Sequence, residues 1–223
     1  MRISVVVPAY NEEKYITRCL VSLTSQEIMP DEIIVVDNNC TDHTIDIAEK
    51  FNVRIVREKK QGMTYARNAG FDNAKFEIIA RTDADTQPPN DWILRIKKGF
   101  EDKNLGALSG PAYYYRFPPM KELSLLINSF FFKKINKMLK HDALFGPNMS
   151  IRKSAWEKVR NTVCLDNRMV HEDIDLSIHL GKHTILRFDT SLAVYTSPRR
   201  WAGLSPEYAH RLLKTLRFHK KFL

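Results

Sequence analysis

Two aspartates, Asp83 and Asp85, stand two residues apart just after a mainly apolar segment, residues 76–80. Because residues i and i+2 of an extended chain point to the same side, both carboxylates are expected to face one point in space. Together with the amide oxygen of Gln87, they form a set of hard oxygen ligands of the kind that Mg²⁺ or Mn²⁺ prefers. An ordinary solvated turn is the alternative interpretation, since acidic residues are common in turns. The rest of the chain must decide between these two.

The first hundred residues alternate between short apolar segments and amphipathic ones. The apolar segments, rich in Val and Ile, predict strands, whereas the segments with helical spacing of apolar residues predict helices. Strands are expected at residues 2–8, 32–36, 53–56 and 76–80, and helices at residues 11–26, 42–51, 64–74 and 91–100. This alternation is typical of a doubly wound parallel sheet with helices on both faces, so we predict an α/β fold.

Polar residues follow three of these expected strands, at residues 10–12, 37–39 and 83–87. The carboxyl ends of parallel strands share one edge of the sheet, which is where such folds bind nucleotides. The sequence has neither the Gly-rich phosphate loop of dehydrogenases nor that of P-loop ATPases. A nucleotidyltransferase is also disfavoured, because no Gly-rich loop with Lys or Arg follows the first strand. A metal held by Asp83 and Asp85 would instead offset the charge of a pyrophosphate.

The second half of the chain has a different pattern. Strands are expected at residues 105–109, 184–188 and 191–195, a turn and strand at residues 146–151, and helices beginning near residues 154, 171 and 206. Residues 122–140 predict a helix with an apolar first half and a basic second half. Two interpretations of this helix stay open: a core helix with one solvated end, or an interfacial helix on a membrane.

Positive charge is concentrated near the end of the sequence. The 223 residues carry a formal net charge of +9, and residues 199–223 contain seven Lys or Arg against one Glu. Such a segment favours a phosphate-bearing partner, an anionic membrane surface or nucleic acid, although a solvated helix face has the same composition. No nucleic-acid-binding motif accompanies the charge, so we do not expect nucleic acid as a partner.

The composition, 43% hydrophobic and 27% charged, is that of a globular domain. The three cysteines, Cys19, Cys40 and Cys164, have the spacing of neither a zinc site nor a disulfide framework, which favours a reduced compartment. The first ten residues predict a strand rather than a signal peptide, and no apolar segment is long enough to span a bilayer. We therefore expect a cytoplasmic protein, with peripheral contact at the cytoplasmic face of the membrane left open.

Seven short motifs occur in order along the chain. They are Val-Pro-Ala-Tyr-Asn-Glu (7–12), Val-Val-Asp-Asn-Asn-Cys-Thr-Asp (35–42), Ala-Arg-Asn-Ala-Gly (66–70), Thr-Asp-Ala-Asp (82–85), Gly-Pro-Asn-Met-Ser (146–150), Glu-Asp-Ile-Asp-Leu (172–176) and Arg-Arg-Trp (199–201). By this ordered set the chain, from Val5 to about Trp201, resembles family 2 of the nucleotide-sugar glycosyltransferases.

The resemblance implies the GT-A fold, a Rossmann-like, mostly parallel central sheet flanked by helices, here followed by a basic amphipathic C-terminal helix. It implies one GT-A domain over residues 1–223. Within this domain we expect a nucleotide-binding half at residues 1–104, an acceptor-binding and catalytic half at residues 105–203, and the basic helix at residues 204–223.

The resemblance also implies roles for individual residues. The nucleotide sugar would be bound by Pro8, Tyr10, Glu12, Asp37, Asn38, Arg67, Asp83 and Arg200. Asp83 and Asp85 resemble the family's DxD pair, and Gln87 matches a D-x-D-x-Q variant found in members similar to dolichyl-phosphate-mannose synthase, so these three would hold Mg²⁺ or Mn²⁺. Asp173 resembles the family's catalytic base, and Glu172 and Trp201 would contact the acceptor.

The implied activity is metal-dependent, inverting transfer of a sugar from a UDP- or GDP-linked donor to a hydroxyl or phosphate of a lipid-linked or cell-surface glycan. Such a transfer needs a base opposite the leaving group and positive charge for the departing diphosphate. Asn38 stands where many members have a second Asp, which leaves the base preference open. Ser197 stands where processive synthases have the Gln of Q-x-x-R-W, which favours single additions. The alternative function is a catalytically inactive nucleotide-sugar-binding subunit of a glycan assembly complex.

Overall fold

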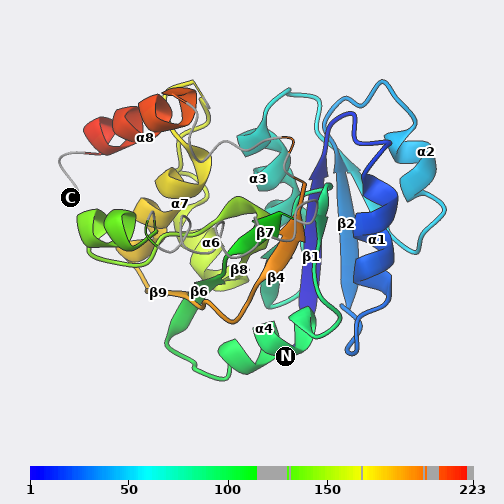
Figure 1. The fold of residues 1–223 in the computed structure, drawn as a ribbon, viewed down its shortest axis with the longest axis horizontal. Coiled ribbons are helices and arrows are strands. Elements are labelled where there is room, and N and C mark those ends of the chain that lie inside the picture. Colours follow the sequence, from blue (N-terminus) through cyan, green and yellow to red (C-terminus); the bar gives the residue numbers. More distant parts are fainter. Residues whose placement is uncertain (115–129, 131, 167, 198, 200–205, 220–223) are drawn as a thin grey trace.

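The computed structural model describes residues 1–114, 130, 132–166, 168–197, 199 and 206–219. Its centre is a seven-stranded sheet in the order β3-β2-β1-β4-β8-β6-β9 (Figure 1). These strands are β1 (Ile3–Ala9), β2 (Glu32–Asp37), β3 (Arg54–Arg57), β4 (Ile78–Arg81), β6 (Leu105–Ser109), β8 (Met149–Arg152) and β9 (Ile185–Phe188). Neighbours among β1 to β4 are parallel, β9 is parallel to β6, and β8 runs antiparallel to both β4 and β6. The mostly parallel α/β sheet predicted from the sequence is confirmed.

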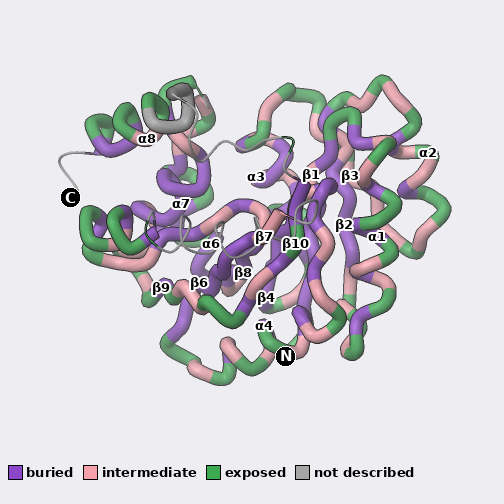
Figure 2. The backbone as a smooth tube through the Cα atoms, in the orientation of Figure 1, coloured by how far each residue is buried: buried purple, intermediate pink, exposed green. Residues whose placement is uncertain are grey.

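Helices cover both faces of this sheet. On one face lie α1 (Ile16–Thr24), α2 (Thr44–Ala48) and α4 (Trp92–Gly99), and on the other lie α3 (Met63–Asn73), α6 (Lys153–Val159) and α7 (Glu172–Gly181). In β1, Val5 and Val7 pack with the first group whereas Val6 packs with the second, because alternate side chains of a strand point to opposite sides. A strand covered on both faces is apolar at nearly every position, as β1 is. Figure 2 shows the strands at the centre of the sheet as buried.

The register of the parallel strands brings their carboxyl ends together. Ala9 at the end of β1 pairs with Asp37 at the end of β2, and Val6 of β1 pairs with Arg81 at the end of β4. The Thr82 N–H then donates to the Val6 carbonyl oxygen at 3.2 Å. The polar segments that follow these three strands therefore share one edge of the sheet, as the alternating pattern predicts.

A second, three-stranded sheet joins distant parts of the chain beside this edge. Its strands are β5 (Thr86–Gln87), β10 (Val194–Thr196) and β7 (Ala112–Tyr114), in the order β5-β10-β7. The Ser197 N–H donates to the Asp85 carbonyl oxygen at 3.2 Å, so the segment after β10 lies next to the acidic pair. Strands of two or three residues carry too little periodicity to be predicted from the sequence, and this sheet was not predicted.

A third apolar cluster lies on the side of α7 that faces away from the sheet. It contains Phe132, Ile135 and Leu139 of helical residues 132–139, Ile174 and Ile178 of α7, and Leu216 of α8 (Pro206–Phe218). Figure 1 shows α8, in red, beside α7. The described part of the predicted helix 122–140 thus packs in a core, whereas residues 122–129 and 131 lie outside the described residues. Within the described residues, no helix has the length and apolar character needed to cross a membrane.

Candidate active site

An open pocket of about 560 Å³ lies where the strand ends meet. Its walls come from the ends of β1 and β2, the loop before α3 and the turn after β4. Its polar lining residues are Tyr10, Glu12, Asn38, Gln61, Asp83 and Asp85. The three polar segments singled out in the sequence therefore contribute to one pocket.

Asp83 and Asp85 lie in a turn between β4 and β5 rather than on an extended strand. The Thr86 N–H donates to the Asp83 carbonyl oxygen at 3.0 Å, which closes the turn. The expectation of an extended chain at this point is wrong, because the chain must turn to enter the small sheet. Both side chains nevertheless line the pocket, and the Asp83 side chain is 28% exposed while that of Asp85 is 8% exposed.

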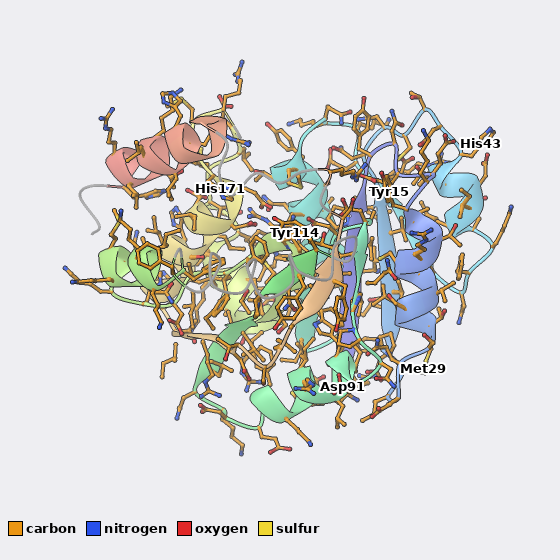
Figure 3. All side chains as sticks on the ribbon, viewed as in Figure 1. Tyr15, Met29, His43, Asp91, Tyr114 and His171 are labelled. Carbon is orange, nitrogen blue, oxygen red and sulfur yellow. The ribbon has the colours of Figure 1, made fainter. Side chains whose placement is uncertain are left out.

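Arg199 places a cation beside these acids. Its Nε donates to Asp85 Oδ2 at 2.9 Å, and its Nη2 pairs with the Glu12 carboxylate. Its guanidinium also lies 4.3 Å from the centre of the ring of Tyr15, which is labelled in Figure 3. One side chain from the segment after β10 thus links the loop after β1 to the turn after β4.

A buried ionic network lies behind the pocket. Arg67 of α3 is fully buried, and its Nη1 lies 2.5 Å from Glu172 Oε2. Arg81 of β4, 1% exposed, pairs with Glu172 Oε1 through Nη1 and with Asp83 Oδ1 at 3.2 Å through Nη2. Burial alone would raise the pKa of Glu172, but the charges of Arg81 and Arg67 outweigh it and lower this pKa to about 2. Glu172 is therefore ionised and held between two arginines.

Asp173, at the start of α7, lies next to this network. Its Oδ2 accepts a hydrogen bond from the Gly146 N–H at 2.9 Å, and its Oδ1 is 3.4 Å from Arg81 Nη1. Burial, followed by the negative charge of Glu172, raises the pKa of Asp173 well above that of an ordinary aspartate. Since Arg81 contacts both Asp173 and Asp83, it connects the predicted base to the predicted metal ligand.

Three carboxylates, those of Glu12, Asp83 and Asp85, line the pocket. The pKa of the Cys19 thiol, which lies 3.5 Å from the Asp83 carbonyl oxygen, is raised first by burial and then by Asp85, Asp83 and Glu12. Hard oxygen donors gathered in this way fit a divalent cation such as Mg²⁺ or Mn²⁺. Because Arg199 holds Asp85 Oδ2, an ion must share this carboxylate with the guanidinium or displace it.

The residues predicted to bind the nucleotide fall into two groups. Pro8, Tyr10 and Glu12 line the pocket. Asn38 also lines it, but its side chain is hydrogen-bonded to the loop before α3: its amide nitrogen donates to the Lys60 carbonyl oxygen at 2.7 Å, and its oxygen accepts from the Gly62 N–H at 2.8 Å.

Asp37 is not among the residues that line the pocket. Its Oδ1 instead accepts a hydrogen bond from the Cys40 N–H at 2.9 Å. The side chains of Asp37 and Asn38 thus shape the loops at the pocket, whatever contact they make with a base.

Two of the predicted contact residues, Arg67 and Glu172, are paired elsewhere in the described structure. Arg67 was expected to bind the nucleotide sugar, but its guanidinium is buried against Glu172 and does not line the pocket. Glu172 was expected to contact the acceptor, but both of its carboxylate oxygens are paired with arginines. Gln87 lies on β5, paired with Tyr195 of β10, and is not among the pocket-lining residues. Arg200 and Trp201 lie outside the described residues.

Sequence reasoning missed Arg81 and Arg199. Arg81 is the last residue of a buried strand, and an arginine in such an apolar segment is a signal for a buried acidic partner. Arg199 stands in the Arg-Arg-Trp motif, but the donor role was given to Arg200, and no local pattern indicates the pairing of Arg199 with Glu12, 187 residues away. Gly62, before α3, has a φ of 147°, which residues with a Cβ rarely adopt, so this loop conformation depends on glycine.

Comparison with known proteins identifies the family of the chain. The model of the family described as glycosyl transferase family 2 matches residues 4–160, which include β1 to β4, the acidic turn and β8. The chain belongs to glycosyl transferase family 2. The family resemblance seen in the sequence is confirmed.

Curated relatives of this family 2 chain include glycosyltransferase AglE of Haloferax volcanii, 35% identical over 101 residues, or 42% of this chain and 33% of the relative. Another relative, of Methanococcus voltae, is 32% identical over 124 residues, or 48% of this chain and 38% of the relative. It is named dolichyl N-acetyl-alpha-D-glucosaminyl phosphate 3-beta-D-2,3-diacetamido-2,3-dideoxy-beta-D-glucuronosyltransferase. The matched segments span well under half the length of these two relatives.

Among solved structures, the mannosyltransferase PcManGT from Pyrobaculum calidifontis, in complex with GDP-Man and Mn²⁺, matches with a TM-score of 0.75 at 20% sequence identity. The match covers 99% of this chain and 64% of that one. At this identity the likeness concerns the fold, and it confirms the GT-A architecture predicted for the family 2 chain.

Proposed function

We propose that this chain is the catalytic domain of a metal-dependent, inverting glycosyltransferase. It moves a sugar from a UDP- or GDP-linked donor to a hydroxyl or phosphate of a lipid-linked or cell-surface glycan. The observation that carries the proposal is the contact of one buried arginine, Arg81, with both Asp83 at the pocket and Asp173 at the start of α7. A donor in the pocket would then have its sugar next to a carboxylate with a raised pKa.

Asp173 acts as the base in the proposed step. The acceptor oxygen attacks the anomeric carbon from the side opposite the diphosphate, the bond from that carbon to the phosphate oxygen breaks, and its electron pair leaves with the diphosphate. Asp173 takes the acceptor proton. Because its pKa is raised, its carboxylate is a stronger base than an ordinary aspartate. The Gly146 N–H fixes the orientation of this carboxylate.

The diphosphate needs positive charge as it departs. Asp83 and Asp85 would hold Mg²⁺ or Mn²⁺, which supplies that charge when bound, and Gln87 remains a proposed third ligand. Arg199 adds a fixed positive charge next to Asp85. The proposed donor contacts of Pro8, Tyr10 and Glu12 follow from their place in the pocket wall.

The proposed acceptor class is suggested by the name of one relative and by the charge of α8. The Methanococcus voltae relative is named for a dolichyl-phosphate-linked sugar, which favours a lipid-linked acceptor here. The basic residues of α8 would suit an anionic membrane surface, where such acceptors reside.

The test is release of the nucleoside diphosphate from a panel of UDP- and GDP-sugars with lipid-linked glycan acceptors and Mn²⁺. This readout does not depend on which glycan accepts the sugar, and the anomeric configuration of the product reports inversion. Asp173→Asn should lower the rate by about 10²–10⁴-fold while donor affinity is unchanged. Asp166→Asn, which changes a partly exposed acid before α7, is the matched control and should keep the wild-type rate.

Turnover retained in Asp173→Asn would contradict the assignment of the base. Donor binding without transfer in the wild-type protein, across all donors and acceptors tested, would contradict the enzyme proposal and favour the inactive binding subunit.

A further inference from the structure

Two histidines and an aspartate meet between α7 and the end of α8, outside the set of residues that lines the pocket. Asp175 and His179 lie on α7, and His219 directly follows α8. Each offers one ligand atom, and the three atoms lie within 4.8 Å of one another. His219 Nε2 is 2.7 Å from Asp175 Oδ1, and His179 Nε2 is 3.7 Å from the same oxygen.

The fold brings these three residues together in two ways. Asp175 and His179 are four residues apart on one helix, a spacing that puts both side chains on the same face. His219 comes from 44 residues further along the chain and reaches this face because α8 packs beside α7. Only the first of these relations is visible in the sequence.

Two ligand side chains are held in place by a second layer of hydrogen bonds. The Thr162 hydroxyl lies 3.0 Å from His179 Nδ1, which leaves Nε2 directed at Asp175. The Cys164 N–H donates to Asp175 Oδ2 at 2.9 Å, which fixes the plane of the carboxylate with Oδ1 toward the imidazoles. Metal-binding histidines and carboxylates are typically oriented by such outer partners.

The burial and charge of the cluster also suit a cation. The side chains of Asp175, His219 and His179 are 0%, 1% and 12% exposed. A positive charge beside a buried carboxylate offsets the cost of burying it, and a divalent ion would supply that charge.

We propose that Asp175, His179 and His219 bind one transition-metal ion of the Zn²⁺ type, at a site separate from Asp83 and Asp85. Two imidazoles and a carboxylate favour Zn²⁺ or Co²⁺ over Mg²⁺, whereas the oxygen ligands of the pocket favour Mg²⁺ or Mn²⁺. Tetrahedral zinc with bonds of about 2.0–2.2 Å separates its ligand atoms by roughly 3.4 Å. On metal binding, the distance from His219 Nε2 to Asp175 Oδ1 would therefore lengthen from 2.7 Å, and the distance from His179 Nε2 to the same oxygen would shorten slightly from 3.7 Å. Water on the exposed side of His179 would complete the four ligands.

A metal ion bound at this site would hold the end of α8 against α7, the helix that begins with Glu172 and Asp173. A second tie already joins the same two elements, because the N–H of His171, labelled beside α7 in Figure 3, donates to Thr215 Oγ1 at 2.6 Å. Metal binding to the folded state alone stabilises that state by mass action. Metal binding would thus stabilise the position of α7, the helix that carries Asp173.

The experiment is titration of the chelator-treated full chain with CoCl₂ and then ZnCl₂, in excess MgCl₂ to occupy the oxygen site. We expect the visible absorption of four-coordinate Co²⁺ to saturate at one ion per chain, to be displaced by Zn²⁺, and to be accompanied by a rise in Tm. His219→Gln, whose amide can still donate to Asp175, should lose this absorption and the rise in Tm. His183→Gln, which changes an exposed histidine just after α7, is the matched control and should keep both.

Thr162→Val tests the site without touching a ligand, and it should weaken Co²⁺ binding by about 10–100-fold. Melting of all variants in chelator, followed by circular dichroism, shows whether they are folded before metal is added. The proposal is overturned if the folded wild-type chain gives no saturable absorption, or if folded His219→Gln binds Co²⁺ as the control does.

Discussion

Glu172 and Asp173 are neighbours in the sequence, yet their surroundings shift their pKa values in opposite directions. Glu172 lies between Arg67 and Arg81, and its pKa falls to about 2. Asp173 is also buried, but it shares only one of these arginines and faces the charge of Glu172, so its pKa rises. This separation gives one carboxylate a structural role and leaves the other suited to take up a proton.

Replacing Glu172 tests its structural role. Glu172→Gln leaves Arg67 and Arg81 buried without their common anion, and loss of one partner from a buried ion pair costs about 3–5 kcal/mol of stability. Chemical denaturation at pH 7 should show a loss of this size. Glu157→Gln, an exposed site on α6, is the control. If Glu172→Gln and Glu157→Gln are equally stable, the ion pairs of Glu172 with Arg67 and Arg81 contribute little to the stability of the fold.

The stability of Asp173→Asn should depend on pH in a defined direction. The folded-state pKa of Asp173 lies above the ordinary 3.8, so the folded protein holds this proton more tightly than the unfolded chain. Asp173 therefore destabilises the fold increasingly as pH rises from 3.8 through its folded pKa. Asp173→Asn should raise Tm at pH 7, and the gain should vanish below pH 3.8.

Glu172 behaves in the opposite sense. It contributes stability above its ordinary pKa of 4.5 and loses that contribution as pH falls toward 2.

A lower Tm of Asp173→Asn than of wild type at pH 7 would contradict the raised pKa of Asp173 in the folded protein.

The segment after β10 connects the two sheets to the pocket through Arg199. Glu12 and Asp85, whose side chains are 6% and 8% exposed, both form ion pairs with this guanidinium. Arg199→Met keeps an apolar stem near Tyr15 but removes the charge. In chelator, stability should fall by about 1–3 kcal/mol, because two buried carboxylates lose a charged hydrogen-bond donor.

Mn²⁺ should reduce this deficit, since a divalent ion at Asp83 and Asp85 replaces the missing charge. Denaturation of Arg199→Met and wild type, with and without Mn²⁺, measures the difference. A deficit that is the same under both conditions would argue against a cation site at these residues.

The sequence predicts single elements of this fold well and their distant contacts poorly. The first four strands were expected to within one or two residues at each end. Three of them, β1, β2 and β4, are buried and apolar over most of their length, which makes them easy to recognise. The β5-β10-β7 sheet was missed, and the turn at Asp83 with it, because the paired segments are far apart in the sequence: Thr86 bonds Thr196, 110 residues away, and Ala112 pairs with Val194. The acidic pair was found for its chemistry, although its local conformation was predicted wrongly.

The same limit applies to the site. Asp83, Asp85 and Asp173 stand in motifs, so their side chains could be singled out from the sequence alone. The pairing of Arg67 and Arg81 with Glu172 joins residues 105 and 91 positions apart, and no local pattern indicates it. Arg67 was consequently assigned to the donor when the fold directs it to Glu172.

Across the whole molecule, the basic C-terminal helix has an inner and an outer side. Leu216 of α8 packs against α7, whereas Leu213 and Phe218 are 52% and 54% exposed, and Lys214 and Arg217 are exposed as well. Deleting α8 would therefore open an apolar core and would not test membrane contact cleanly.

Reversing charge on the outer side is a cleaner test. Lys214→Glu combined with Arg217→Glu should lower binding to anionic vesicles at least tenfold, because each basic residue near such a surface contributes about 1 kcal/mol. Lys50→Glu combined with Lys98→Glu makes the same charge change at exposed positions elsewhere. Co-sedimentation that is equally affected in both pairs would indicate a general charge effect rather than contact through α8.

The central claim is that the pocket binds a nucleotide sugar through a divalent ion at Asp83 and Asp85. The most direct measurement is a thermal-shift screen of UDP- and GDP-sugars with and without Mn²⁺, on wild type, Asp85→Ala and the control Asp46→Ala, whose side chain is 70% exposed. We predict that at least one nucleotide sugar raises Tm beyond Mn²⁺ alone in wild type and control, and does so in neither Asp85→Ala nor metal-free protein. An equal rise in Asp85→Ala, or one that does not require Mn²⁺, would contradict the claim.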